Sequence, residues 1–354
     1  MTGRSRNKNF VPSLKRSYVL TGCWTILFGL LTTQTASAHV KWFCAYNVAG
    51  QPRGLENVLC PDFELLVGLA LSLLLAGCLL EGTFLGDAMI RSMDRVTRVM
   101  RENTELIMRA TVGAFFVSIW VLGGIILTPE LKTTAQWIGP LQLAIAAGML
   151  SRKTLPLSAI GIVVLYAKGV QDYGIFHLLD YPIFLGIALY LALTGLQKTL
   201  FGIDPIDIIR YGAGITLMWA SVEKWAYPEW SFPLFITHPN LSFGFDREFY
   251  MRAAGVVEFT LAFSLLWTPL VRRFAATVLS GMFISACFEF GKIDVIGHSC
   301  IVAVLFVIVA DNRKKAENDR RVPLLAPVGF CAGLAVTLFV YYVAHAEIFH
   351  TTVL

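Results

Sequence analysis

The sequence contains few charged residues and none of the motifs that mark the common soluble enzymes. Only 15% of its 354 residues are charged. It has no glycine-rich phosphate loop, no Gly-x-Ser-x-Gly, no Cys-x-x-Cys-His haem attachment and no basic-aromatic surface of the kind that binds nucleic acid. No two of its seven cysteines stand three positions apart, which excludes a zinc ribbon and a Cys-x-x-Cys redox motif. We therefore expect no nucleic-acid partner and none of these soluble activities.

Long apolar runs fill most of the chain. Hydrophobic residues make up 56% of the sequence and the mean hydropathy is +0.65, which is typical of a polytopic membrane protein. Most runs approach the roughly twenty residues that a helix needs to cross a bilayer. We predict an all-α protein in contact with the lipid bilayer, with helices near 62–85, 107–128, 135–151, 155–172, 177–197, 207–227, 250–268, 273–290, 293–311 and 324–346.

The N-terminus has the three parts of a secretory signal. Five basic residues precede a short apolar stretch, and Ala36-x-Ala38 follows it. Residues 1–38 are therefore either a cleaved signal peptide, which would leave His39 as the first residue, or an uncleaved anchor helix. Residues 39–61 then form an exported loop in which Cys44 and Cys60 can form a disulfide.

Basic residues between the apolar runs indicate the sidedness of the helices. Lys and Arg cluster in alternate connections, which places those connections in the cytoplasm. Residues 62–106 comprise a membrane helix and a cytoplasmic amphipathic link, and residues 312–354 comprise a basic loop, the last helix and an exported tail. The expected location is the cytoplasmic (inner) membrane of a bacterium, with multiple passes and a site that faces the periplasm or exterior.

Two parts of the chain resemble each other. Residues 107–197 and 198–311 are predicted to be four-helix units in the same orientation, so the expected fold is two tandem four-helix bundles plus flanking helices. The clearest match pairs Asp172-Tyr173-Gly174 and His177 with Glu289-Phe290-Gly291 and Asp294. A parallel repeat of this kind occurs in some transporters, with the site at the repeat interface, and also in proteins that only bundle helices.

Three short motifs in the second unit suggest a family. They are Arg210-x-x-x-Gly214, Ser221-Val-Glu-Lys224-Trp225 followed by Pro228, and Gly297-His298. With these motifs, the unit resembles the DoxX-like family of four-helix membrane proteins, which includes a subunit of thiosulfate:quinone oxidoreductase. The first unit is a degenerate copy that lacks the Glu-Lys pair. The resemblance implies a four-helix fold and a redox association, with no catalytic motif to transfer.

The stretch from Phe288 to Ser299 concentrates ionisable residues between two apolar runs. Each such residue at membrane depth costs roughly 2.5 to 3.5 kcal/mol, so the group needs water, mutual pairing or a bound ion. Asp294 and His298 stand four apart and so share one helical face, where the carboxylate can orient the ring or share an ion with it. A buried hydrogen bond between them is the alternative. A second shell or proton relay is predicted from Glu258, Glu289, Glu223, Lys224, Asp172 and His177, which otherwise pair structurally.

The histidines fall at the exported ends of the predicted helices. The candidate metal ligands are His39, His298, Asp294, His238, His345 and His350. Imidazole suits copper, zinc, iron and haem iron alike. An N-terminal His39 would offer both its amine and its ring to one ion, which favours Cu(II). Copper is therefore the expected cofactor, with haem or quinone as alternatives.

These observations support three hypotheses of different classes. The leading hypothesis is an outer-face site that binds a transition metal or redox cofactor, used in metal handling or in quinone-linked electron transfer with a redox partner protein. The second is a transporter of a small solute or ion that uses the repeat interface. The third is a non-catalytic assembly factor of the membrane. The sequence does not decide whether the protein is an enzyme.

Overall fold

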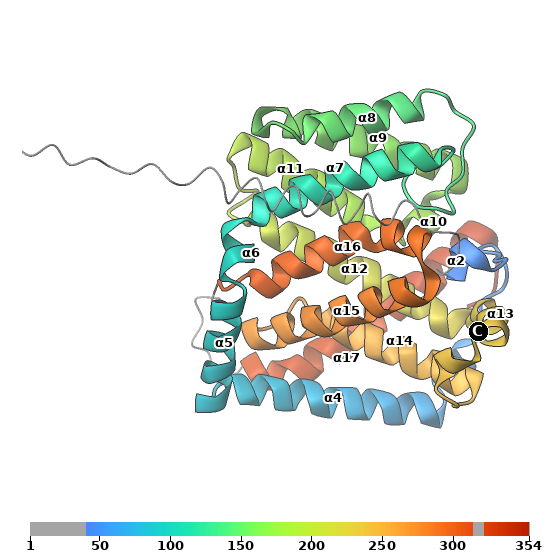
Figure 1. Ribbon diagram of the computed structural model, residues 1–354. Helices are drawn as coiled ribbons and strands as arrows, with labels where there is room; N and C mark the ends of the chain where they lie inside the picture. Colours follow the sequence, from blue (N-terminus) through green and yellow to red (C-terminus); the bar gives the residue numbers. More distant parts are fainter. Residues whose placement is uncertain (1–39, 314–321, 354) are drawn as a thin grey trace, which may run out of the picture.

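The structure is a computed structural model that describes residues 40–313 and 322–353, and both parts are helical (Figure 1). No β-strand occurs within these two ranges. The helices are α2 (Val40–Phe43), α3 (Leu55–Val58), α4 (Pro61–Glu81), α5 (Phe84–Val96), α6 (Arg98–Glu102), α7 (Thr104–Leu122), α8 (Ile138–Gly148), η1 (Arg152–Thr154), α9 (Leu155–Tyr173), α10 (Ile175–Leu178), α11 (Pro182–Leu196), α12 (Pro205–Ala226), η2 (Pro228–Ser231), α13 (Phe232–Thr237), η3 (Pro239–Ser242), α14 (Arg247–Ser264), α15 (Pro269–Phe290), α16 (Lys292–Ala310) and α17 (Val322–Phe349).

Six helices in the described ranges are long and apolar enough to cross a membrane. They are the spans Pro61–Glu81, Thr104–Leu122, Arg152–Tyr173, Pro269–Phe290, Lys292–Ala310 and Leu325–Phe349. Helices α8 and α11 are apolar but shorter. The predicted all-α, multi-pass membrane fold is confirmed. The predicted signal segment, residues 1–38, and His39 lie outside the described residues.

Local sequence signals set the ends of these helices. Four α-helices begin at a proline, whose fixed φ and missing N–H suit the first turn: α4, α11, α12 and α15. Helices α9 and α15 end at Gly174 and Gly291, whose φ angles of 84° and 77° are easily adopted only without a Cβ. Both glycines lie in the segments that the sequence matched between the two units.

The helices from α7 to α16 form a closed ring of contacts. In the first unit α7 contacts α8, α8 contacts α9, and α9 contacts α11; in the second, α12, α14, α15 and α16 follow in the same way. Helix α11 packs on α12 and α16 packs on α7, so the last helix of each unit lies against the first helix of the other. This packing is the one expected of two copies that face each other, while the duplication itself remains a prediction.

The units approach closely where α11 meets α12. A Cβ added to Gly212 would lie 3.3 Å from Cα of Gly186, so two glycines let the backbones come together. Around this contact, Phe116, Leu191 and Val304 belong to one buried apolar cluster that spans both units. A second cluster joins α4, α12, α14 and α17. The interior is thus continuous across the unit boundary.

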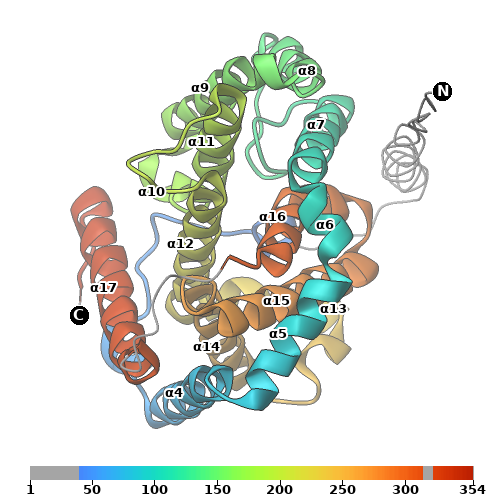
Figure 2. The same ribbon diagram turned by 90° about the vertical axis from the view of Figure 1, so that its left-hand side faces the viewer.

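The two ends of the bundle differ. Figures 1 and 2 show α5 and α6 running across one end, while Figure 1 shows α2 and α13 at the other. Arginines of the predicted cytoplasmic connections lie at the α5–α6 end: Arg273 bonds Asp94 of α5 at 2.7 Å, and Arg152 pairs with Glu105 at the start of α7 at 3.4 Å. The end that carries α2 is therefore the one that the sequence predicts to be exported.

Candidate functional site

A cavity of about 250 Å³ lies between the two four-helix units near the α2 end. The first unit contributes the connections around Thr128 and Asp180 and the start of α11. The second contributes α12, α14, α15 and α16, and α2 and η2 add Trp42 and Trp230. Among the charged groups on its walls are Lys41, Asp180, Glu223, Lys224 and Glu258. The cavity therefore combines an apolar lining with a concentrated set of charges.

Lys41 is the most deeply buried of these cations, with 4% of its surface exposed. Its ammonium group forms ion pairs with Asp180 of the first unit and, at 2.5 Å, with Glu223 of the second. Burial opposes the charge on Lys41, but the Asp180 and Glu223 carboxylates outweigh burial and raise its pKa above the usual value. Lys41 thus stays protonated and joins both units to α2.

Trp42, the next residue, reaches α16. Its ring lies 5.0 Å from the His298 ring, centroid to centroid. A Cβ added at Gly297 would lie 1.9 Å from the Trp42 indole, so only glycine leaves room for this contact. Helix α2 is therefore held by a buried charge on one residue and by a close ring contact on the next.

A second ion pair lines the other side of the cavity. Lys224 of α12 and Glu258 of α14 lie 2.6 Å apart, and both side chains are partly exposed. The sequence predicted that Glu223 pairs structurally or acts as a relay, and the structure pairs it with Lys41. Adjacent residues of α12 thus carry opposite charges and pair with partners on different helices.

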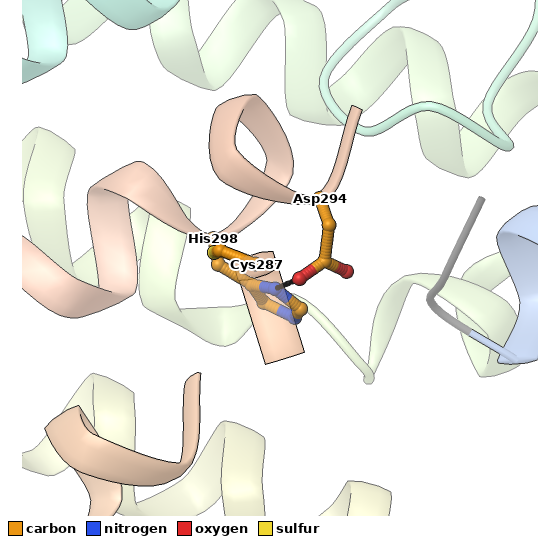
Figure 3. A group of neighbouring side chains, drawn as sticks. All are labelled: Cys287, Asp294 and His298. Atoms are coloured by element: carbon orange, nitrogen blue, oxygen red, sulfur yellow. Dashed lines mark hydrogen bonds and ion pairs between the residues drawn. The ribbon is translucent and has the colours of Figure 1, made fainter. Parts of the chain in front are cut away.

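Three potential metal ligands meet where α15 turns into α16 (Figure 3). One ligand atom each from Cys287, Asp294 and His298 lies within 4.8 Å of the others. His298 donates a hydrogen bond from Nδ1 to Oδ2 of Asp294 over 3.0 Å, as their spacing of four predicted. Asp294 is fully buried, and its Oδ1 has no hydrogen-bond partner among the described residues. His298 also lines the cavity.

This ligand set fits a transition-metal ion. Donor atoms bound to one ion at about 2.0 to 2.3 Å in tetrahedral geometry lie about 3.3 to 3.8 Å apart, so side-chain shifts of up to roughly 1 to 1.5 Å would bring the three into place. A thiolate and a carboxylate supply two negative charges, which a divalent cation would balance. Thiolate with imidazole is a combination that suits zinc and copper. The carboxylate can bind the ion or orient the His298 ring.

The structure does not bring the other predicted histidines to this cluster. His345 is fully buried within α17, where it hydrogen-bonds Tyr227, the Val48 carbonyl and Thr351. His238 lies against the Phe290 ring and hydrogen-bonds Thr237, and His350 is exposed. The predicted histidine cluster is therefore replaced, within the described residues, by the one histidine His298 beside a thiol and a carboxylate.

Two predicted relay acids lie apart from the cavity. Asp172 is exposed and pairs with Lys168 on its own helix at 2.6 Å. Glu289 is exposed at the end of α15. Both residues precede the glycines that end α9 and α15, where the side chain points to the surface. Of the predicted relay acids, Glu223 and Glu258 line the cavity.

The predicted disulfide is not formed in the structure, where Cys44 and Cys60 carry free thiols. Cys60 directly precedes α4 and packs against the apolar cluster that includes Val58 and Phe63. Cys44 follows α2 and interacts with the backbone of Leu234. The two cysteines are held by different neighbours, because α2 is drawn into the cavity by Lys41.

His177 is buried in the connection between α9 and α11. Rings of Tyr46, Tyr173 and Tyr181 surround it, with centroids 5.6, 5.6 and 6.3 Å from the imidazole. Burial, with a further contribution from the Lys41 charge, lowers the pKa of His177 to about 4. The ring is therefore neutral at physiological pH. Nearby, burial raises the pKa of Glu130, which accepts a hydrogen bond from Tyr181.

Sequence reasoning missed three residues of this region: Lys41, Asp180 and Cys287. Lys41 stands in an exported loop that resembled ordinary solvated chain, and Asp180 stands in a short connection. A weak signal existed for Cys287, because it directly precedes the polar stretch that begins at Phe288. It lies one turn before Gly291, so the chain reversal returns it to the start of α16.

Comparisons with known proteins found no match: no protein-family model, no curated protein and no solved structure matches this chain. The resemblance of the second unit to the DoxX-like family remains a prediction.

Proposed function

We propose that this membrane protein binds one transition-metal ion through Cys287, Asp294 and His298. The observation that carries the proposal is the convergence of a thiol, a buried carboxylate and an imidazole within 4.8 Å of one another, where α15 turns into α16. The buried Oδ1 of Asp294 supports it, because an unpartnered carboxylate oxygen is costly unless a ligand or ion satisfies it. Copper or zinc is the ion proposed, since thiolate and imidazole suit both.

The metal site would face the periplasm of a bacterial cytoplasmic membrane. The basic residues at the α5–α6 end support this orientation, because Lys and Arg favour the cytoplasmic side. Metal handling follows from such a site directly. Electron transfer with a quinone or a redox partner protein, as the resemblance to the DoxX-like family implies, would require copper or haem iron.

Metal analysis of the purified full-length chain tests this proposal. We expect one equivalent of copper or zinc to remain bound to the wild type after loading and gel filtration, and to be lost in Cys287→Ser and in His298→Gln. His350→Gln is the matched control, because His350 is exposed and is not one of the three proposed ligands. Retention of the metal in both site variants, or failure of the wild type to bind either ion, would overturn the proposal.

A second candidate function is small-solute transport, which the position of the cavity between the two units favours. Transport requires that the cavity open alternately to both sides. An Ala220→Cys variant places a thiol on the cavity wall. Labelling from both sides by a membrane-impermeant thiol reagent would support transport, and labelling from the exported side alone would count against it.

A further inference from the structure

The cavity between the units is large enough to hold a small organic molecule. Its volume of about 250 Å³ exceeds the roughly 150 Å³ of an apolar cavity that holds benzene. Apolar walls come from Phe184, Leu217, Phe283 and Ile301, and Ala220 leaves room on α12. A single ring with a short substituent therefore fits the space, whether or not the neighbouring cluster holds a metal.

The charged groups on the walls favour a positive ligand. Two ammonium groups, Lys41 and Lys224, face three carboxyl groups, Asp180, Glu223 and Glu258, so the acidic groups outnumber the basic groups by one. A cation that enters the cavity can pair with one of these acidic groups in a place where little water screens the interaction.

Aromatic rings around the cavity add a second preference for cations. The Lys41 ammonium lies 5.6 Å from the centre of the Trp230 ring and 5.8 Å from that of Tyr46, while two carboxylates bond it. The wall thus already holds one ammonium group between carboxylates and ring faces, which is the environment that stabilises organic cations. Trp42, Tyr181 and Tyr227 extend the aromatic lining.

The geometry points to a second binding site in this protein, which adjoins the metal cluster at His298: the cavity binds a small organic cation, an amine with an apolar ring or chain. The amine end lies toward Glu223 and Glu258, and the apolar end lies against Phe184, Leu217 and Ile301. Glu258 bonds Lys224 through Oε2 and Glu223 bonds Lys41 through Oε1. Each carboxylate has a second oxygen for a ligand.

Three probes of nearly equal size separate charge from shape: benzylamine, benzyl alcohol and benzoate. The full-length protein in nanodiscs, treated with a chelator to remove bound metal, is titrated with each probe and followed by tryptophan fluorescence and calorimetry. We expect benzylamine to bind at one site at least about tenfold more tightly than the other two, because only the amine can pair with the Glu223 or Glu258 carboxylate. Equal or tighter binding of benzyl alcohol or benzoate would overturn the proposal.

Two variants locate the site. Glu258→Gln should weaken benzylamine binding about tenfold, and Ala220→Leu should abolish it by filling the cavity. Glu289→Gln is the matched control, since Glu289 is exposed outside the cavity, and it should leave binding unchanged. The two site variants act through charge and through volume, so one still tests the proposal if the other fails to fold. Undiminished binding in a folded site variant, or no benzylamine binding by the wild type, would refute it.

Discussion

The two four-helix units turn their chains in the same way but place their ionisable residues differently. Glycine with positive φ ends α9 in the first unit and α15 in the second. After the first turn comes His177, neutral and surrounded by tyrosine rings. After the second comes Asp294, buried and bonded to His298. The same backbone turn thus supports a packed imidazole in one unit and a potential metal site in the other, so the units differ in their side chains more than in their backbone.

The largest effect is expected at the residue that joins the units. Lys41→Met would leave Asp180 and Glu223 buried without their shared cation, and loss of one partner from a buried ion pair costs about 3 to 5 kcal/mol. We expect the free energy of unfolding, measured by titration with SDS, to fall by that amount. Lys132→Met changes an exposed lysine of the first unit and should have little effect. Equal stability of the two variants would show that Lys41 does not hold the units together.

A pH effect of up to about 3 kcal/mol is expected from His177. Its pKa of about 4 in the folded protein lies below the usual 6.5, so between these values the unfolded chain binds a proton that the folded chain does not. Stability should therefore fall as the pH drops from 6.5 to 4. His177→Phe should remove this dependence, whereas His350→Phe should retain it. A wild-type unfolding curve that is unchanged between pH 6.5 and 4 would contradict the burial of a neutral imidazole.

A substitution that forces the two units apart should lower the stability of the protein by an intermediate amount. Gly212→Leu would insert a side chain where α12 meets Gly186 of α11, and overpacking of this kind costs about 1 to 3 kcal/mol. Gly281→Leu provides the control, because an added Cβ there meets nothing within 4 Å. Both changes improve helix propensity, so the difference in melting temperature isolates the interface. A Gly212→Leu protein as stable as the control would show that the units need not touch here.

The smallest effect is expected at the ion pair on the surface of the first unit. Asp172→Asn would remove the pairing with Lys168, and a surface pair four residues apart contributes about 0.3 to 0.5 kcal/mol. Thermal unfolding at low salt should show a correspondingly small decrease, and high salt should reduce it further. A loss above about 1 kcal/mol would mean that Asp172 has a structural role like that of the buried acids in the second unit.

Hydrophobic patterning predicted the helices well, because a membrane helix is visible in the sequence as one continuous apolar run of about twenty residues. All ten predicted segments correspond to helices, and the four-residue spacing of Asp294 and His298 predicted their hydrogen bond. The rest of the site depends on contacts between distant segments, such as Lys41 with Glu223, which no local period encodes. Because His345 lies near the C-terminus, the sequence suggested that it was exposed and could bind a metal. In the structure α17 extends to Phe349, and His345 is buried.

The burial of Lys41 has a consequence for how the chain is made. Its two acidic partners follow it by 139 and 182 residues, so a ribosome must make most of the first unit before Asp180 is added and begin the second unit before Glu223 is added. Until Asp180 is added, the lysine lacks both acidic partners. This segment can therefore dock completely only after α12 has been made, and a nascent chain halted before residue 180 would expose Lys41 to amine-reactive reagents that the finished protein excludes.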